Sequence, residues 1–280
     1  MSKQSLIFIL VFSPAVLGAQ ATEPAGPPIQ DNSFLIEEAY NQDPGIVQHI
    51  FTFQTHRGSS DFEGSFTQEW PVGSIKHQLS YDLFLIRSGH ETGLGDVRIN
   101  YRYQAIGTGL TRLAVAPRLS VTLPTGDWKK GQGIGVAGVE TMLPVSYVLS
   151  PLFTTHFDAG LALTPSARNT AGDRANVYAI TLGHSLILTA HPNVQFLVET
   201  LYDRDQVVTG KGTTDWTDDL VISPGVRGAI NFASGLQIVP GIAVPIGVGP
   251  SHGERGVFLY LSFEHPFKRI DGPPLLERRP

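Results

Sequence analysis

From Ile46 onward, apolar and polar residues alternate along the chain, often one by one. Val97 and Ile99, for example, alternate with Arg98 and Asn100. A period of two is the period of a β-strand, because successive side chains of a strand point to opposite faces. The alternation therefore predicts strands that have one apolar face and one polar face.

Stretches with this pattern recur along the rest of the chain. The twelve stretches cover about residues 46–55, 62–71, 76–87, 95–105, 111–123, 136–148, 152–163, 174–189, 193–204, 216–230, 235–246 and 255–267. Most are longer than the common soluble strand of about 5–6 residues. They match the roughly 9–11 residues that a tilted strand needs to cross a bilayer. We therefore predict an all-β fold, a transmembrane up-and-down antiparallel β-barrel of about twelve strands over residues 46–267.

The connections between these stretches differ in length in a regular way. If the first strand runs outward, the even-numbered connections are short, as in 149–151 and 190–192. The odd-numbered connections are mostly longer and rich in Gly and charged residues, as in 124–135, 164–173 and 204–215. Outer-membrane barrels have short periplasmic turns and longer outer loops. This rhythm favours a barrel in the outer membrane of a Gram-negative cell.

A soluble β-sandwich would show the same alternation but would bury its apolar face inside. Alternation alone does not tell which face is outside, so the number and length of the strands and an N-terminal export signal favour the barrel. Prolines inside the predicted strands remove ladder hydrogen bonds. We therefore expect bulges or bends at Pro117, Pro144, Pro224, Pro240 and Pro245.

The first residues have the features of an export signal. Lys3 precedes an apolar run over residues 6–12, and Ala19 and Ala21 are small residues at the positions that a signal peptidase reads. The run is too short for a helical membrane anchor, which needs roughly 20 residues. We predict a signal peptide over residues 1–21.

The segment that precedes the barrel, residues 22–45, has two parts. Its first part is rich in Pro and Gly and reads as a tether. Capping residues at 31–33 then precede good helix formers, and Asp43-Pro44-Gly45 stops them, so we predict a short helix over residues 34–42. Residues 268–280 follow the last predicted strand as a C-terminal tail.

Composition excludes several classes of protein. The chain has 280 residues, a net charge of −5 and no cysteine, which argues against a basic nucleic-acid binder and a disulfide scaffold. His184 and Ser185 lie on opposite faces of a strand, so they do not form a nucleophile and base pair. His156 and Asp158 share a face, but no serine is placed at matching depth. We expect no catalytic site, no metal and no cofactor.

Several short segments together resemble one known family. The segments 93–97 (GLGDV), 101–103 (YRY), 116–118 (APR), 123–127 (LPTGD) and 143–147 (LPVSY) are similar to the outer-membrane transporter family labelled "MetA-pathway of phenol degradation". The resemblance implies a twelve-stranded barrel that passes small molecules, among them aromatic compounds, across the outer membrane. The family is grouped with the functional-amyloid secretion pore, whose members carry a coiled coil, for which this chain has no room, and a plug helix.

Charged residues on the polar faces of neighbouring strands are predicted to form a row in the lumen. Reflecting strands about their turns places Arg98 opposite Arg118, brings Asp82 towards Arg98, and brings Glu140 towards Arg118. The expected row is Asp82, Arg98, Arg118 and Glu140, with Arg102 on the same face. The row either narrows the lumen and biases which solutes pass, or it only neutralises its own charges.

The predicted N-terminal helix is a candidate plug. Its side chains Phe34, Glu37, Glu38 and Tyr40 could fill the lumen, and we expect the two glutamates to dock near the arginines of the row.

The function that follows is a passive outer-membrane transporter or pore for small molecules. Its partners are membrane lipid and a small solute, without nucleic acid. Two alternatives stay open, an export pore for a secreted partner and a structural barrel that does not conduct.

Overall fold

The computed structural model describes residues 29 and 31–267 of the chain. The predicted signal peptide, most of the tether and the C-terminal tail lie outside the described residues. The strand segments are β1 (Ile46–His56), β2 (Phe62–Val72), β3 (Ser74–Ser88), β4 (Glu91–Leu94), β5 (Val97–Tyr103), β6 (Leu113–Val115), β7 (Arg118–Leu123), β8 (Gly138–Met142), β9 (Val145–Ser150), β10 (Phe153–Arg168), β11 (Arg174–His191), β12 (Val194–Gly210), β13 (Thr213–Gly228), β14 (Ile230–Asn231), β15 (Gln237–Ala243), β16 (Ile246–Gly247) and β17 (Gly256–Pro266). Two single 3₁₀ turns, η1 (Trp128–Lys130) and η2 (Gly249–Ser251), lie in connections.

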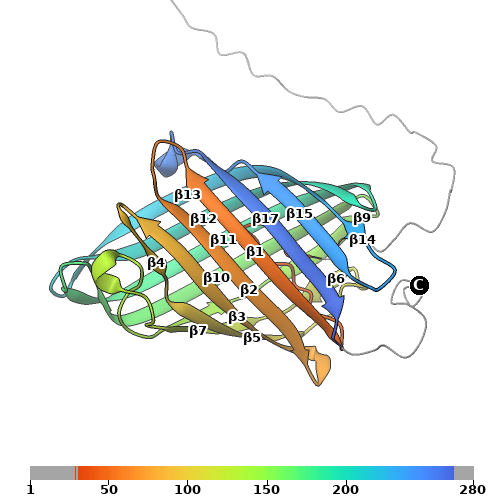
Figure 1. The fold of residues 1–280 in the computed structure, drawn as a ribbon, viewed down its shortest axis with the longest axis horizontal. Helices are drawn as coiled ribbons and strands as arrows, with labels where there is room; N and C mark the ends of the chain where they lie inside the picture. The colour runs from red at the N-terminus through yellow and green to blue at the C-terminus, as the bar shows by residue number, and fades with distance from the viewer. Residues whose placement is uncertain (1–28, 30, 268–280) are drawn as a thin grey trace, which may run out of the picture.

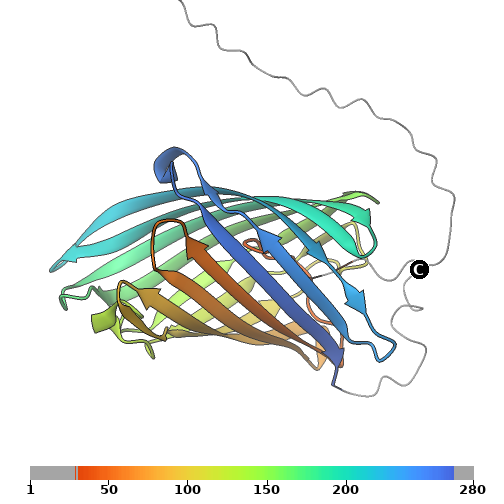
Figure 2. The same cartoon turned by 45° about the horizontal axis from the view of Figure 1, so that its top comes forward.

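These segments form one closed antiparallel barrel of 12 strands (Figure 1). Strands that follow each other in the chain pair with each other, and the barrel closes where β1 pairs with β17 from Ile46↔Pro266 to His56↔Gly256. Figure 2 shows the tilt of the strands around the lumen. The predicted up-and-down barrel is confirmed.

Breaks in the strands explain why there are more segments than barrel strands. Pro117 separates β6 from β7, Pro144 separates β8 from β9, and Pro245 separates β15 from β16, as expected. The same expectation is wrong for Pro224 and Pro240, which lie inside β13 and β15. Both prolines lie one residue outside the stretch over which β13 and β15 pair, Gly225↔Ala243 to Arg227↔Gly241, so their missing N–H groups interrupt no ladder there.

The two predicted long connections in the second half of the barrel are mostly strand. β11 and β12 contain 18 and 17 residues. Only residues 169–173 connect β10 to β11, and only residues 211–212 connect β12 to β13. Residues 203–206 are polar on both faces, so the alternation that marks a strand is absent there. Alternation is required only where one face meets an apolar environment, which is why sequence analysis ended these strands too early.

The distribution of side chains is that of a membrane barrel rather than a soluble sandwich. Large apolar side chains face outward and are exposed, for example Leu161 at 62% and Leu182 at 50%. Polar side chains such as Glu199, Ser223 and Ser262 face the lumen and are fully buried. An oily exterior of this extent is stable against hydrocarbon and not against water. No helix among the described residues is long and apolar enough to span a bilayer.

The predicted helix over residues 34–42 is wrong. Residues 31–42 contain bends but no helical turn, and they run inside the barrel. The backbone N–H groups that a helix would pair internally are instead bound by side chains of the wall, beginning with Glu199 and Asp158. Partners that lie far away in the sequence therefore decide the conformation of this segment.

Candidate functional site

The segment 31–42, here called the strap, follows the inner wall of the barrel. The N–H groups of Leu35, Glu37 and Ala39 donate to Glu199 of β12 (3.0 Å), Asp158 of β10 (2.7 Å) and Ser146 of β9 (2.8 Å). Further along, the N–H groups of two more residues donate to the wall, Asn41 to Gln104, which directly follows β5 (2.9 Å), and Gln42 to Gln78 of β3 (2.7 Å). The strap thus passes one strand after another around the lumen, close to the end with the short turns.

Two arginines hold the carbonyl groups of the strap. Arg227 of β13 donates to the carbonyls of Asp31 (2.9 Å) and Asn32 (2.6 Å). Arg102 of β5 donates to the carbonyls of Glu38 (3.3 Å) and Tyr40 (2.6 Å). Because N–H and C=O groups are bound at both ends, the strap keeps its extended form without helical hydrogen bonds.

The two ends of the strap meet at one residue of β1. Gln48 donates to the Asp31 carboxylate and accepts from the side chain of Gln42. Tyr260 and Ser262 of β17 donate to the same carboxylate, the former at 2.6 Å. The strap is therefore a nearly closed loop that lines the barrel from within.

A buried ion pair crosses the space inside this loop. The Glu38 carboxylate accepts from Arg227 at 2.8 Å, and the two side chains are 4% and 0% exposed. His156 of β10 lies 3.9 Å from the same carboxylate, and its other ring nitrogen is 2.7 Å from the Ser146 hydroxyl. The expectation that no serine lies at the depth of His156 is therefore wrong. These side chains are therefore out of reach of solvent at the level of the strap.

Apolar side chains of the strap fit into the wall where the wall has glycines. A Cβ atom added to Gly241 would lie 2.5 Å from the ring of Phe34, and one added to Gly183 would collide with Ile36. Phe34 also packs against Phe258 and Tyr260, with ring centroids 5.7 and 5.2 Å apart. The strap thus completes an apolar core inside the barrel.

The predicted charged residues of the wall lie together. Arg98 bonds to Asp82 at 2.7 Å and lies 3.5 Å from Glu140, which also pairs with Arg118. The expected register of the two arginines is wrong, because Arg102 and not Arg98 lies opposite Arg118. The connection between their strands turns around residue 110, two residues later than expected, because Ile106 and Val115 still pair.

The predicted plug residues all lie inside the barrel, with partners that differ in part from those expected. Glu37 pairs with Arg118 and lies 3.8 Å from Arg102, as the docking hypothesis requires. Glu38 reaches Arg227 instead, and the Tyr40 ring meets His156 edge-on at 6.0 Å.

The sequence pattern does not identify the wall residues that hold the strap, among them Arg227, Glu199 and Asp158. These residues share one feature that the sequence does give, since each occupies an inward-facing position of its strand. That phase gives the face on which a side chain lies, but not its partner.

Burial changes the acidity of the strap's own carboxyl groups. It raises the pKa of Glu38 above its ordinary value, although Arg227 acts in the opposite direction. Burial likewise raises the pKa of Asp31, again against the effect of Arg227. Both groups therefore hold a proton more tightly in the docked strap than in water.

Comparisons with solved structures identify the same architecture elsewhere. The chain is similar to an outer membrane channel from Pseudomonas putida F1, with a TM-score of 0.58 and 14% identity over 81% of this chain and 97% of that one. It is also similar to the NanC porin (TM-score 0.52) and the KdgM porin (TM-score 0.50), each with 10% identity over 77% of this chain and 98% of the other. These relatives are outer-membrane channels. At such low identity the similarity establishes a porin-like fold.

No protein-family model matches the chain, and no curated protein does. Membership in the phenol-degradation family therefore stays a prediction. Within the described residues, no group of three or more His, Cys, Asp or Glu side chains is arranged to hold a metal ion.

Proposed function

We propose that this protein is an outer-membrane channel for small solutes whose lumen is closed by the strap. The observation that carries the proposal is the docked strap itself, whose buried Glu38–Arg227 pair fills the lumen of a porin-like barrel. A channel of twelve strands is intermediate between side-chain-filled barrels of about eight strands and open porins of about 16–18 strands. Side chains and the strap therefore decide whether solutes pass.

The strap lies at the end of the short turns, which in outer-membrane barrels is the periplasmic end. In this orientation solutes enter from outside, reach the strap, and pass when it leaves the wall. The charged residues Asp82, Arg98, Arg102, Arg118 and Glu140 then belong to the path, since two of the arginines pair with the strap residue Glu37. Residues 46–267 form the channel, and residues 1–21 direct its export.

Liposome swelling tests this proposal. The full chain is compared with a chain that lacks residues 31–42, using a panel of sugars, amino acids and phenolic compounds, the last because of the family resemblance. We expect the deletion to increase the swelling rate for small solutes. Circular dichroism and resistance of the folded band to SDS verify that the barrel has formed.

Absence of swelling with both chains would contradict the channel and favour a structural barrel. Equal swelling with both chains would contradict closure by the strap. Passage only of a secreted polypeptide would favour the export pore.

A further inference from the structure

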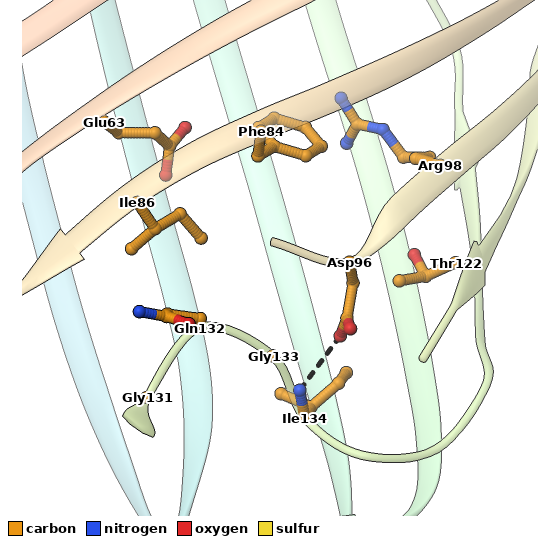
Figure 3. A pocket seen from close by; sticks show the side chains of 10 residues that line it. All are labelled: Glu63, Phe84, Ile86, Asp96, Arg98, Thr122, Gly131, Gln132, Gly133 and Ile134. Carbon is orange, nitrogen blue, oxygen red and sulfur yellow. Dashed lines mark hydrogen bonds between the residues drawn. The ribbon is translucent and has the colours of Figure 1, made fainter. Parts of the chain in front are cut away.

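A second part of the lumen lies beyond the strap, at the end with the long connections. It contains a cavity of about 320 Å³, here called the vestibule, lined by Glu63, Phe84, Ile86, Asp96, Arg98, Thr122 and residues 131–134 (Figure 3). The loop 131–134 folds over this space because Asp96 accepts from the N–H groups of Gly126 (2.8 Å) and Ile134 (2.9 Å). Both oxygens of Asp96 are thus used to hold the loop.

Two polar groups of the vestibule have no partner within the described part of the protein. Gln132 is 4% exposed, and its side-chain Nε2 donates to nothing. The Glu63 carboxylate has no hydrogen bond and no ion pair within 4.0 Å among the described residues. A buried donor without a partner is unfavourable. A ligand that accepts from Gln132 would recover this energy.

The only basic side chain among the residues that line the cavity is already neutralised. Arg98 bonds to Asp82 and approaches Glu140, and its guanidinium lies 5.5 Å from the centre of the Phe84 ring. Its charge still acts on Glu63, but it makes no ion pair with that carboxylate. Phe84 and Ile86 give the vestibule an apolar wall next to this free carboxylate.

Further carboxylates line the opposite side of the lumen. Asp203 of β12 lies directly opposite Asp219 of β13, and Asp205 follows on the same face. Their described hydrogen-bond donors are hydroxyl groups, Thr181 for Asp203 (2.7 Å) and Ser251 for Asp219 (2.8 Å). Like charges directly opposite each other repel, and carboxylates around a narrow space attract cations.

We propose that the vestibule binds small organic cations. The ammonium group of such a solute pairs with Glu63, a neighbouring oxygen accepts from Gln132, and its apolar part packs on Phe84 and Ile86. An ammonium group has three donors and no acceptor, which suits a free carboxylate. This inference rests on the proposed function, because it names the class of solute that the channel would admit.

Equilibrium binding to the detergent-solubilised full chain, followed by calorimetry, tests the proposal without requiring transport. The probe is leucinol, which carries an ammonium group, an adjacent hydroxyl and a branched apolar group. Its anionic counterpart is 2-hydroxy-4-methylpentanoate. We expect leucinol to bind at least about tenfold more tightly than the anion, since charged hydrogen bonds contribute about 1.5–3 kcal/mol.

Substitutions then locate the site. Glu63→Gln is expected to weaken leucinol binding about tenfold, and Gln132→Leu to weaken it to a smaller extent. Asp218→Asn is the matched control, because Asp218 neighbours Asp219 on the strand but faces outward, where it accepts from Tyr202. Its affinity for leucinol should be unchanged.

Equal affinity for the two probes, or an unchanged affinity in Glu63→Gln, would overturn the inference. A chain that binds leucinol but never supports swelling would contradict only the channel. A chain that supports swelling but does not bind leucinol would contradict only the cation site.

Discussion

Inward-facing charged side chains have different partners in the two parts of the lumen. Around the strap, Arg102 and Arg227 are buried and bind backbone carbonyls and carboxylates of the same chain. In the part of the lumen beyond the strap, Glu63 and the facing pair Asp203 and Asp219 have no basic side chain within 4.0 Å among the described residues. The same strand phase therefore produces a closure where the chain supplies the partners. Where the chain supplies none, it leaves carboxylates without a basic partner, which is the surface that we propose for solutes.

Among the substitutions that test this difference, the replacement of Arg227 should have the largest effect, because it should release the strap from the wall. Arg227→Met leaves the buried Glu38 carboxylate without its partner and frees two strap carbonyls. Breaking a buried pair costs about 3–5 kcal/mol, so the strap should leave the wall far more often. Because the chain has no cysteine, a cysteine at Ser33 reports this directly through its rate of maleimide labelling.

We expect labelling of the Ser33→Cys chain to accelerate by roughly a hundredfold or more when Arg227 is replaced. Arg204→Met is the control, since Arg204 lies on the outer surface and is 43% exposed. An equal labelling rate with and without Arg227 would show that this arginine does not hold the strap.

In the vestibule, Asp96→Asn should loosen the loop that covers the cavity. The substitution removes a charged acceptor shared by Gly126 and Ile134, and hydrogen bonds to charged groups contribute about 1.5–3 kcal/mol. Trypsin should then cut faster after Lys129 and Lys130, which lie in the same loop. Asp127→Asn, which affects only a local contact to Lys129, should have a smaller effect. The opposite ranking would contradict this role of Asp96.

A methyl group on the wall should disturb the strap more mildly. Gly241→Ala places a Cβ against the Phe34 ring, and overpacking costs about 1–3 kcal/mol. The labelling rate at position 33 should rise, but less than with Arg227→Met. Gly64→Ala is matched to it, because a Cβ there meets nothing closer than 3.6 Å. A rise in both variants would point to general loosening of the barrel.

Acidification should give the smallest effect, and it should tighten the strap. The pKa of Glu38 is raised in the docked state and returns to its ordinary value of 4.5 when the carboxyl meets water. This group therefore favours docking most at low pH, and the contribution is lost as the pH rises through the raised pKa.

Labelling at position 33, corrected for the reactivity of free cysteine, should be slower at about pH 5 than at about pH 8. The difference should shrink in Glu38→Gln, while the part due to Asp31 remains. An unchanged pH dependence in Glu38→Gln would show that Glu38 is not responsible.

The strands were predictable because the backbone forces a period of two wherever one face meets an apolar environment. The facing of Asp82 and Arg98 followed from the same rule and a two-residue turn. The strap was not predictable, since the N–H of Leu35 finds its acceptor 164 residues away and local helix preference loses to that bond. The Arg102–Arg118 register depended on where a longer connection turns, which strand alternation does not determine.

A reversible covalent lock on the strap tests its role as the closure most directly. The hydroxyl oxygens of Ser33 and Ser185 lie 3.2 Å apart inside the barrel, so Ser33→Cys with Ser185→Cys can form a disulfide. We expect single-channel openings to be absent in the oxidised protein and to begin when a reductant is added, whereas the Ser33→Cys chain alone should not respond to the reductant. Equal conductance in the oxidised and reduced protein would contradict closure of the lumen by the strap.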